Sequence, residues 1–554
     1  MQHQEYDDVP NQSPRLELTW PGKDHFLLVP KDEAGKPVWV DRDHPAASEV
    51  RLTDFTEAVG DADDTAPHAD NLLFTGDSLD VLRILCEVPE YRREYRGKIQ
   101  LIYMDPPFNT GQTFEHYDDW MEHSTWLSFM RDRLLLIRDL LAPAGTVWVH
   151  LDNFEVHRMR CLMDEIFGAD NFINAAIWRR TSAKSAAKRG MGTMYDSILV
   201  YGRSESARLK PILLPYSQEY IASKYRNVDE RGRYQLGDLT APGVRTGDSG
   251  QEWRGHDPSS RKRHWAAPKI EGFMDEEWSS LSTRQRLDAL WGAGYIQAPK
   301  NLGSAPRFKR YYNRSGGVAM GDLWTDVSVI NSQAIERTGY DTQKPEQLLE
   351  RVIKLSTDPG DIVMDTFVGS GTTAAVAHKL ERRWVAADIL PTTVQEYVVP
   401  RLRAIVQGAE LSGITKAIGW NGGGGFRTVQ VGPSMYEQTP FGVMLADWAT
   451  NGRFARAVAG QLGFDWQPEA SPFCGVRSRM RLAVFDGAVG PEEIRQVVSA
   501  LGEMERVTVV AQAVLPGAEK LLGELSRGSQ LRKAPRDLLT AGAARVRRRE
   551  GVSR

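Results

Sequence analysis

The stretch DIVMDTFVGSGTT, residues 361–373, reads as a short buried strand, a glycine-rich turn and the start of a helix that continues over 374–380. Gly369 and Gly371 allow the backbone to turn tightly and approach a ligand, and the first N–H groups of the helix lack partners within it. The segment Trp384–Asp388 predicts the next strand, and an acid at its end can hold the two hydroxyls of a ribose. This order predicts an α/β fold.

The glycine turn alone does not decide which cofactor the chain binds. Residues Gly369–Ala374 also fit the G-x-G-x-x-A pattern of dinucleotide-binding proteins, so a nicotinamide or flavin enzyme is a rival interpretation. A P-loop nucleotide enzyme is disfavoured, because no Lys-Ser or Lys-Thr follows the glycines. Asp365, directly before the turn, and the motif described next favour S-adenosylmethionine instead.

A second motif, Asp105-Pro106-Pro107-Phe108, follows the mostly apolar run Ile99–Met104. A nucleobase amine is a poor nucleophile, because its lone pair is delocalised into the ring. The Asp105 carboxylate and the Pro106 carbonyl can accept its two protons, while Phe108 stacks on the base and Pro107 keeps the loop rigid. The base must first leave the double helix. Asp-Pro-Pro is also an ordinary strand-ending turn, so the motif alone does not decide the function.

Several stretches in the same order resemble the β-class of amino DNA methyltransferases, closest to the modification (Mod) subunits of Type III restriction-modification systems. In that family the amine motif precedes the cofactor motif, as here, which implies a circularly permuted, Rossmann-like class I methyltransferase sheet. Phe108 stands where Tyr is commoner, which keeps the stacking ring and loses the hydroxyl. The resemblance covers most of 71–400 and is carried by Phe74–Leu82, Asp105–Gly111, Thr146–Asp152, Ile177–Arg179, Tyr195–Tyr201 and Thr342–Pro345 with its helix over 346–355.

The resemblance implies transfer of a methyl group from S-adenosyl-L-methionine to the N6 amine of a flipped adenine in duplex DNA, without a metal. Asp at position 105 favours adenine over the alternative, cytosine N4. A methyltransferase acting on RNA or on a protein amide, and a DNA-binding subunit without catalysis, remain as alternatives. The implied catalytic residues are Asp105, Pro106, Pro107 and Phe108, and the implied cofactor-binding residues are Asp77, Lys344, Asp365, Phe367, Gly369, Gly371, Thr372 and Asp388.

Charge is distributed unevenly along the chain. The net charge is −4, yet residues 171–320 hold 25 Lys and Arg against 14 Asp and Glu, a local charge of +11. Phosphate binding depends on local potential, so this segment suits DNA, although charged runs are usually solvated surface and aromatics usually core. Basic and aromatic residues alternate over Trp253–Trp265 and Arg307–Arg314, and a second basic cluster includes Lys184, Lys188 and Arg189. The predicted DNA contacts are Arg179, Arg180, Arg254, Arg261, Lys262, Arg263, Lys309 and Arg310.

These placements predict an acidic N-terminal extension over 1–70, a catalytic half over 71–201, a target-recognition insert over 202–323 and a cofactor-binding half over 324–406. Glycines at 422–425 predict a flexible boundary before a small α+β module over 426–554, with a basic tail at 545–549. Three separated cysteines predict core positions, not a disulfide or zinc site, and we expect a cytoplasmic protein without a membrane span. The resemblance allows a restriction or helicase-nuclease subunit as a partner, and a homodimer.

Overall fold

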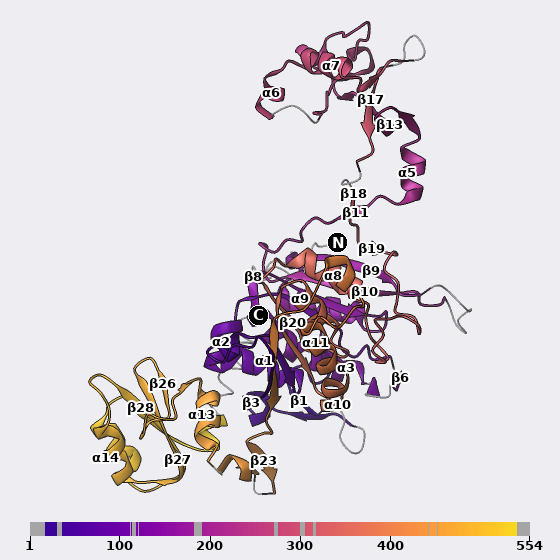
Figure 1. Cartoon of the computed structure of the whole chain (residues 1–554). Helices are drawn as coiled ribbons and strands as arrows, with labels where there is room; N and C mark the ends of the chain where they lie inside the picture. The colour runs from indigo at the N-terminus through magenta and orange to yellow at the C-terminus, as the bar shows by residue number, and fades with distance from the viewer. Residues whose placement is uncertain are drawn as a thin grey trace, which may run out of the picture. The chain divides into compact units, whose positions relative to one another are not determined.

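The computed structural model describes residues 17–29, 36–110, 112–113, 118–119, 121–181, 191–270, 275–299, 305–313, 317–440, 442–450 and 452–539. The chain forms two compact units, one made of Met1–Lys210 and Gly321–Arg554 and the other of Pro211–Met320 (Figure 1). The second unit lies inside the predicted insert, 202–323. Five residues of the predicted motifs and clusters, and the basic tail at 545–549, lie outside the described residues: Gly111, Lys184, Lys188, Arg189 and Arg314.

A ten-stranded sheet forms the centre of the first unit. Its order is β19-β9-β10-β8-β5-β20-β21-β4-β22-β3, and the run from β8 to β22 is parallel. The strand β10 pairs antiparallel with β8 and β9, and β3 pairs antiparallel with β22. The strands are β19 (Leu323–Trp324), β9 (Phe172–Arg179), β10 (Tyr195–Gly202), β8 (Leu141–Leu151), β5 (Ile99–Met104), β20 (Ile362–Asp365), β21 (Arg383–Asp388), β4 (Leu72–Thr75), β22 (Gly425–Val431) and β3 (Thr53–Gly60).

The neighbours of β20 confirm the predicted permuted, Rossmann-like sheet. This strand lies between β5, which comes much earlier in the chain, and β21, which directly follows. Parallel neighbours need a long crossover, and here the crossovers are helices on the two faces of the sheet. On one face α1 (Ser78–Glu87), α3 (His123–Leu140) and α4 (Val156–Phe167) pack together, and α8 (Glu346–Ser356), α9 (Thr372–Lys379) and α11 (Val399–Val406) pack together as a second group.

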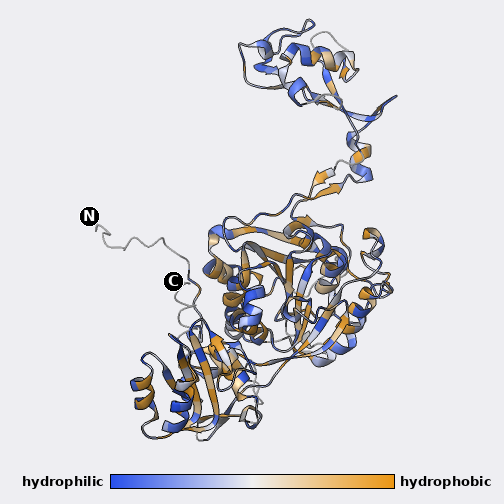
Figure 2. Cartoon of the chain, turned by 60° about the vertical axis from the view of Figure 1, so that its left-hand side comes forward, coloured by the Kyte–Doolittle hydropathy of each residue, from blue (hydrophilic) through white to orange (hydrophobic). Residues whose placement is uncertain are grey.

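The core follows the alternation of side chains along the strands. Leu72 and Phe74 of β4 pack in one cluster with the apolar side of α3, which includes Trp126, Leu134 and Ile137, all fully buried. Apolar residues therefore gather in the strands and on the inward sides of the helices (Figure 2). Burial of this kind contributes roughly 25 cal/mol per Å² of apolar surface. Cys86 is buried, but Cys161 is exposed on α4, so a core position for every cysteine was wrong.

Two strands of the central sheet lie where the sequence predicted no part of it. The strand β3 belongs to the predicted acidic extension, and β22 begins at Gly425, the last of the glycines predicted as a flexible boundary. After β22, a smaller sheet has the order β25 (Asp465–Trp466), β26 (Gly475–Arg477), β27 (Met480–Val489), β28 (Arg506–Val514) and β29 (Gln530–Lys533). The helices of this module are α13 (Phe454–Leu462), α14 (Pro491–Ser499) and α15 (Ala518–Leu525).

The second unit has its own core. An antiparallel sheet orders β12 (Asn227–Asp229), β13 (Gly232–Asp238), β17 (Arg307–Tyr311) and β16 (Ile296–Gln297), beside α6 (Asp275–Ser280) and α7 (Thr283–Gly292). Trp253, Trp265 and Trp278 pack there against Leu287 and Leu290 of α7. The tryptophans of the aromatic and basic stretch are therefore core residues. Across the described residues of both units, no helix is long and apolar enough to cross a membrane.

Candidate active site

Four acids mark the carboxyl ends of four adjacent parallel strands. Asp105 follows β5, Asp365 ends β20, Asp388 ends β21 and Asp77 lies two residues after β4. Ligands of open α/β sheets bind at this edge. A cavity of about 900 Å³ lies there. Of the predicted catalytic and cofactor residues it is lined by Asp77, Asp105, Pro106, Pro107, Phe108, Lys344, Asp365, Phe367, Gly369, Thr372 and Asp388; Gly371 is not part of its wall.

The glycine turn has the conformation that its sequence requires. Gly369 has a φ of +48° and Gly371, the N-cap of α9, a φ of +81°, a region that favours glycine. A Cβ on Gly369 would lie 3.1 Å from the ring of Tyr340, so the turn packs closely against that ring. The N–H of Gly369 donates to Oδ2 of Asp388 at 3.1 Å. The turn is therefore tied to the end of β21, where an acid was predicted to hold a ribose.

Asp365 sits beneath the turn and is almost fully buried. Its carboxylate accepts hydrogen bonds from the Thr373 hydroxyl at 2.6 Å and from the Phe367 N–H at 2.9 Å. Burial raises the pKa of Asp365 to about 7, the two hydrogen bonds oppose the rise, and the charges of Asp105 and Asp388 add to it. The carboxyl group thus fixes the start of α9 and titrates near neutral pH.

The Asp105–Phe108 loop is held by contacts on both sides. The Trp126 indole N–H donates to the Pro107 carbonyl at 2.8 Å. Asn109, which has a φ of +63°, donates to Glu155 Oε1 at 2.7 Å and accepts from the Met121 N–H at 2.6 Å. These contacts hold the loop in the conformation that the structure shows, and a loop held in this way lowers the entropy cost of aligning a substrate.

Asp105 presents one paired and one unpaired oxygen. Its Oδ2 bonds to the Lys344 ammonium group, which also lies 5.2 Å from the centre of the Phe108 ring. Its Oδ1 is buried and accepts no hydrogen bond from the described residues. A buried acceptor without a donor is costly, so a donor that enters the cavity gains by pairing with it. Lys344 was predicted to reach the cofactor, and in the structure it contacts Asp105.

Asp77 has two structural contacts beside the cavity. It caps α1 by accepting from the Leu79 N–H at 2.8 Å, and both of its oxygens lie 2.9 Å from Nη2 of Arg133. The Arg133 guanidinium lies 3.5 Å from the centre of the Phe129 ring, which in turn packs 6.1 Å from the Phe367 ring. Phe367 and Asp77 are thus joined into one wall of the cavity.

The Asp105–Phe108 loop and the glycine turn therefore open into one cavity, and one family match covers both segments. A model of the DNA methylase family matches residues 99–398. The chain belongs to the DNA methylase family. This match confirms the family predicted from the motifs.

Two relatives in sequence agree with the family match. The methylase is 31% identical over 387 residues to the Type II methyltransferase M.EcaI of Enterobacter cloacae, covering 69% of this chain and 76% of that one. It is 30% identical over 343 residues to the Type III restriction-modification enzyme StyLTI Mod subunit of Salmonella typhimurium, covering 55% of this chain and 49% of that one. Among solved structures it is similar to the complex of M1.HpyAVI with SAM, at 14% identity and a TM-score of 0.30, covering 60% of this chain and 98% of that one.

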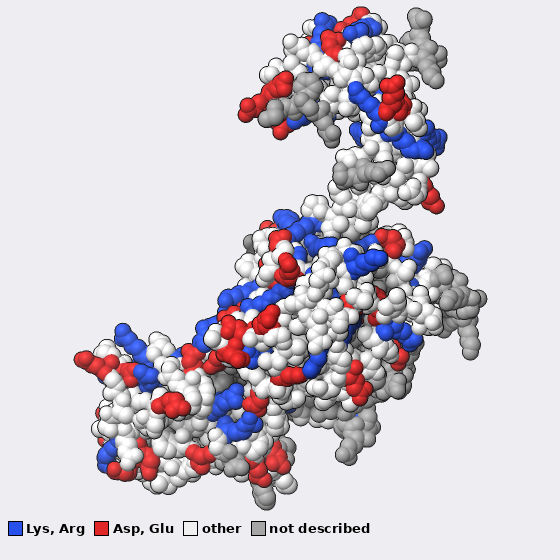
Figure 3. Space-filling model, in the orientation of Figure 1, with Lys and Arg blue, Asp and Glu red and all other residues white. Residues whose placement is uncertain are grey.

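The predicted DNA contacts of the methylase fall into different environments. Arg180 lines the cavity, and Arg179 donates to the Thr325 carbonyl at 2.9 Å. In the second unit Lys309 pairs with Asp229 at 2.9 Å, Arg263 donates to Thr240, and Arg254 lies 4.7 Å from the centre of the Trp291 ring. Arg261, Lys262 and Arg310 are exposed. On the face in Figure 3, Lys and Arg of this unit are interspersed with Asp and Glu.

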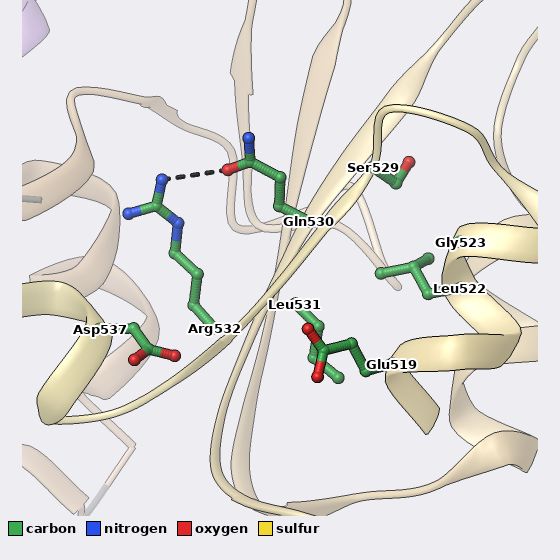
Figure 4. A pocket seen from close by; sticks show the side chains of 8 residues that line it. All are labelled: Glu519, Leu522, Gly523, Ser529, Gln530, Leu531, Arg532 and Asp537. Carbon is green, nitrogen blue, oxygen red and sulfur yellow. Dashed lines mark hydrogen bonds between the residues drawn. The ribbon is translucent and has the colours of Figure 1, made fainter. Parts of the chain in front are cut away.

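A second hollow, of about 590 Å³, lies in the C-terminal module between α15 and β29 (Figure 4). Arg532 donates there to Oε1 of Gln530 at 3.0 Å, and Glu519 and Asp537 also line it. Its charged groups come from no predicted motif. Among the described residues, no group of three or more His, Cys, Asp or Glu is placed to hold a metal ion.

Sequence reasoning missed the residues that support the site. Trp126 was not among the predicted residues, and its indole N–H holds the Asp105–Phe108 loop. Asn109 lies within the recognised stretch Asp105–Gly111, and its positive φ and its hydrogen bonds give it a structural role that the sequence did not assign. Tyr340 precedes the Thr342–Pro345 segment and packs on the glycine turn. No local pattern marks these contacts, because each joins residues far apart in the chain.

Proposed function

We propose that this methylase transfers a methyl group from S-adenosyl-L-methionine to the N6 amine of an extrahelical adenine in duplex DNA. The observation that carries the proposal is the buried, unpaired Oδ1 of Asp105 in a cavity that also holds the glycine turn. An amine that donates to Oδ1 satisfies this atom, and a second proton can go to the Pro106 carbonyl. Both bonds draw the lone pair onto nitrogen, and Phe108 provides the ring on which the base stacks.

The cavity fits the cofactor by its polar groups. The N–H groups at the start of α9 and the Asp388 carboxylate suit a polar nucleoside, while Phe367 and Tyr340 provide apolar walls. S-adenosylmethionine supplies a methyl group that is already activated on a sulfonium. The residues of the chain therefore have to align the amine, exclude water and accept its protons. Lys344 must turn away from Asp105, or share it, when the amine binds.

Cytosine N4 is the second candidate, because the matching family model spans both N6 and N4 amino methylation. Both amines offer two protons to the same acceptors. The carboxylate at position 105, which the resemblance associates with adenine, favours N6.

Single-molecule sequencing tests the proposal directly. DNA from cells that express the intact chain is compared with DNA from cells that express Asp105→Ala, and Asp170→Ala, an exposed acid on the surface, serves as the matched control. We expect N6-methyladenine in one sequence motif with the intact chain and with Asp170→Ala, and none with Asp105→Ala. N4-methylcytosine would support the second candidate, and unmodified DNA would refute both. Binding of S-adenosylhomocysteine to purified Asp105→Ala, measured by calorimetry, checks that the cavity is intact.

We also propose that the methylase is the modification part of a restriction-modification or related defence system. Its support is the relative named as a Mod subunit, of which this chain spans about half the length. A restriction or helicase-nuclease subunit would then be a partner, and a homodimer and a cytoplasmic location would be expected. Purification from its own host, followed by light scattering and mass spectrometry, would reveal such a partner and the number of copies.

A further inference from the structure

A line of buried polar side chains runs behind the Asp105–Phe108 loop. Tyr103 of β5, His150 of β8 and Asp196 of β10 are each at most 1% exposed. The Tyr103 hydroxyl lies 2.8 Å from His150 Nδ1, and His150 Nε2 lies 3.1 Å from Asp196 Oδ2. Three polar groups in the middle of a sheet are costly unless each has a partner, so this line needs an explanation beyond packing.

The protonation of the line follows from its contacts. Burial raises the pKa of Tyr103 well above its ordinary value, with help from the charges of nearby carboxylates, so Tyr103 keeps its proton. A hydroxyl that donates to His150 Nδ1 leaves the imidazole proton on Nε2, where it donates to Asp196. Burial raises the pKa of Asp196, but the hydrogen bond from His150 and the charges of Arg180 and Lys344 lower it below its ordinary value. Asp196 is therefore a buried anion.

One oxygen of this anion faces Arg180. Asp196 Oδ1 is buried and accepts no hydrogen bond from the described residues, and it lies 3.4 Å from Arg180 Nε. The Arg180 side chain is 39% exposed and lines the cavity, whereas that of Asp196 is 1% exposed. Asp196 thus anchors the Arg180 guanidinium, and the part of this group that does not face Asp196 is open to the cavity.

The same line supports the stacking ring. His150 stacks on Phe108 with ring centres 5.8 Å apart and planes 28° apart, and Trp178 packs edge-on against His150 at 5.7 Å. His150 therefore touches the ring proposed to stack on the base and the carboxylate that anchors Arg180. His150 therefore positions the Phe108 ring directly and Arg180 through Asp196.

Electrostatics shows what Arg180 is placed to bind. Asp77, Asp105, Asp365 and Asp388 line the cavity, and such a wall repels a phosphate. Among the described residues that line it, Lys344 and Arg180 are the two cations, and Lys344 is paired with Asp105. A nucleotide whose base enters the cavity must bring its own phosphodiester to the rim. The planar donors of arginine match the oxygens of such a group.

We propose that Arg180 binds the phosphodiester of the extrahelical nucleotide, and that Asp196, held by His150, is a positioning residue for Arg180. This inference rests on the proposed function and adds the nucleotide backbone to the substrate contacts of the same site. It assigns a role to the buried carboxylate that the chemistry at Asp105 does not use. Arg180 acts on binding and orientation, because an arginine guanidinium does not serve as a general acid or base in proteins.

Initial rates of methyl transfer test this proposal. The substrate is unmethylated bacterial genomic DNA, the methyl donor is radiolabelled S-adenosylmethionine, and the salt concentration is varied. The variants are Arg180→Ala, Arg180→Lys, Asp196→Asn and the double variant. Arg96→Ala is the matched control: Arg96 forms a similar pair with Asp139 at 3.1 Å, is 42% exposed, and precedes β5 at the opposite edge of the sheet.

We expect Arg180→Ala to raise the DNA KM about tenfold and to reduce the slope of log KM against log salt by about one, since one phosphate contact is lost. Asp196→Asn should also raise the DNA KM and reduce the salt slope, although Arg180 is still present in this variant. The double variant should be no worse than Arg180→Ala alone, because both changes remove the same contact. Arg180→Lys should recover part of the KM.

Two results would overturn the inference. In the first, Arg180→Ala keeps the salt slope of the intact chain and behaves like Arg96→Ala. In the second, Asp196→Asn loses affinity for S-adenosylhomocysteine in calorimetry and leaves the salt slope unchanged, which would make Asp196 a purely structural group. Absence of methyl transfer by the intact chain would instead refute the proposed function, and this inference with it.

Discussion

Asp365→Asn should remove a pH dependence of the free energy of unfolding that is caused by the Asp365 carboxyl group beneath the glycine turn. The asparagine side chain has the same shape, can still accept from the Phe367 N–H, and carries no charge at any pH. In the intact chain the pKa of Asp365 is raised to about 7, chiefly by burial. The folded state therefore holds this proton over a pH range in which the unfolded chain, with a pKa near 3.8, has lost it.

The sign and size of the effect follow from these values. A raised pKa stabilises the folded state fully below the unfolded pKa, and the stabilisation is lost as the pH rises through about 7. Between pH 5 and the folded pKa lie about two pH units, each equivalent to about 1.4 kcal/mol, so about 3 kcal/mol should be lost between pH 5 and pH 9. The loss should level off above pH 8, where both states are ionised.

Guanidinium unfolding, followed by tryptophan fluorescence at pH values from 5 to 9, measures this difference. Trp384 lies fully buried in β21, beside the strand that carries Asp365, and contributes to this signal. The free energy of unfolding of the intact chain minus that of Asp365→Asn should fall by about 3 kcal/mol across the range. Asp361→Asn, before the other end of β20, is the control. A difference that stays constant with pH would refute the argument, because it would mean that Asp365 keeps one charge state throughout.

Three further substitutions test the supports of the site. Trp126→Phe removes the N–H that holds the Pro107 carbonyl, so kcat for methyl transfer should fall about tenfold with unchanged affinity for S-adenosylhomocysteine in calorimetry; an unchanged kcat would contradict a positioning role. Lys379→Met leaves the buried Glu346 carboxylate with one cation fewer, so the free energy of unfolding, measured by guanidinium titration, should fall by about 3 kcal/mol. An unchanged free energy of unfolding would show that apolar contact can replace the ion pair. Gly371→Ala, at a φ of +81°, should cost about 1–3 kcal/mol in the same titration; a stable variant would show that the turn can change its conformation.

The central strands and the helices after them could be predicted because their signals are local. The sequence placed a strand over 361–365 and a helix from 374, and the structure has β20 at Ile362–Asp365 and α9 at Thr372–Lys379. A run of apolar residues that ends in an acid and a glycine turn fixes the strand, the turn and the direction of the helix together. The order of strands then followed from the resemblance.

The edge of the sheet could not be predicted in the same way. The strand β3 contains Glu57 and several exposed residues, and its partner β22 lies far away in the sequence. Pairing of this kind is decided by contacts between segments that are distant in the sequence. An edge strand with a solvent-exposed face has little apolar alternation from which the strand could be predicted. The contact of Lys344 with Asp105 was missed for the same reason: spacing showed two motifs, and only the fold shows which atoms meet.

The points at which the chain enters and leaves the second unit explain how one chain can combine the site of the first unit with a second unit that has its own core. The chain leaves the first unit at Lys210, whose N–H donates to the Leu355 carbonyl at 2.8 Å, and it returns at Gly321. Just inside, β11 (Leu213–Pro215) and β18 (Gly317–Ala319) pair antiparallel, so the outgoing and returning segments run side by side. A unit joined through one such pair and built on its own core can change its surface without disturbing the acids at the strand ends. If this unit reads the DNA sequence, as the sequence predicts for the insert, specificity can change while the chemistry proposed for Asp105 is preserved.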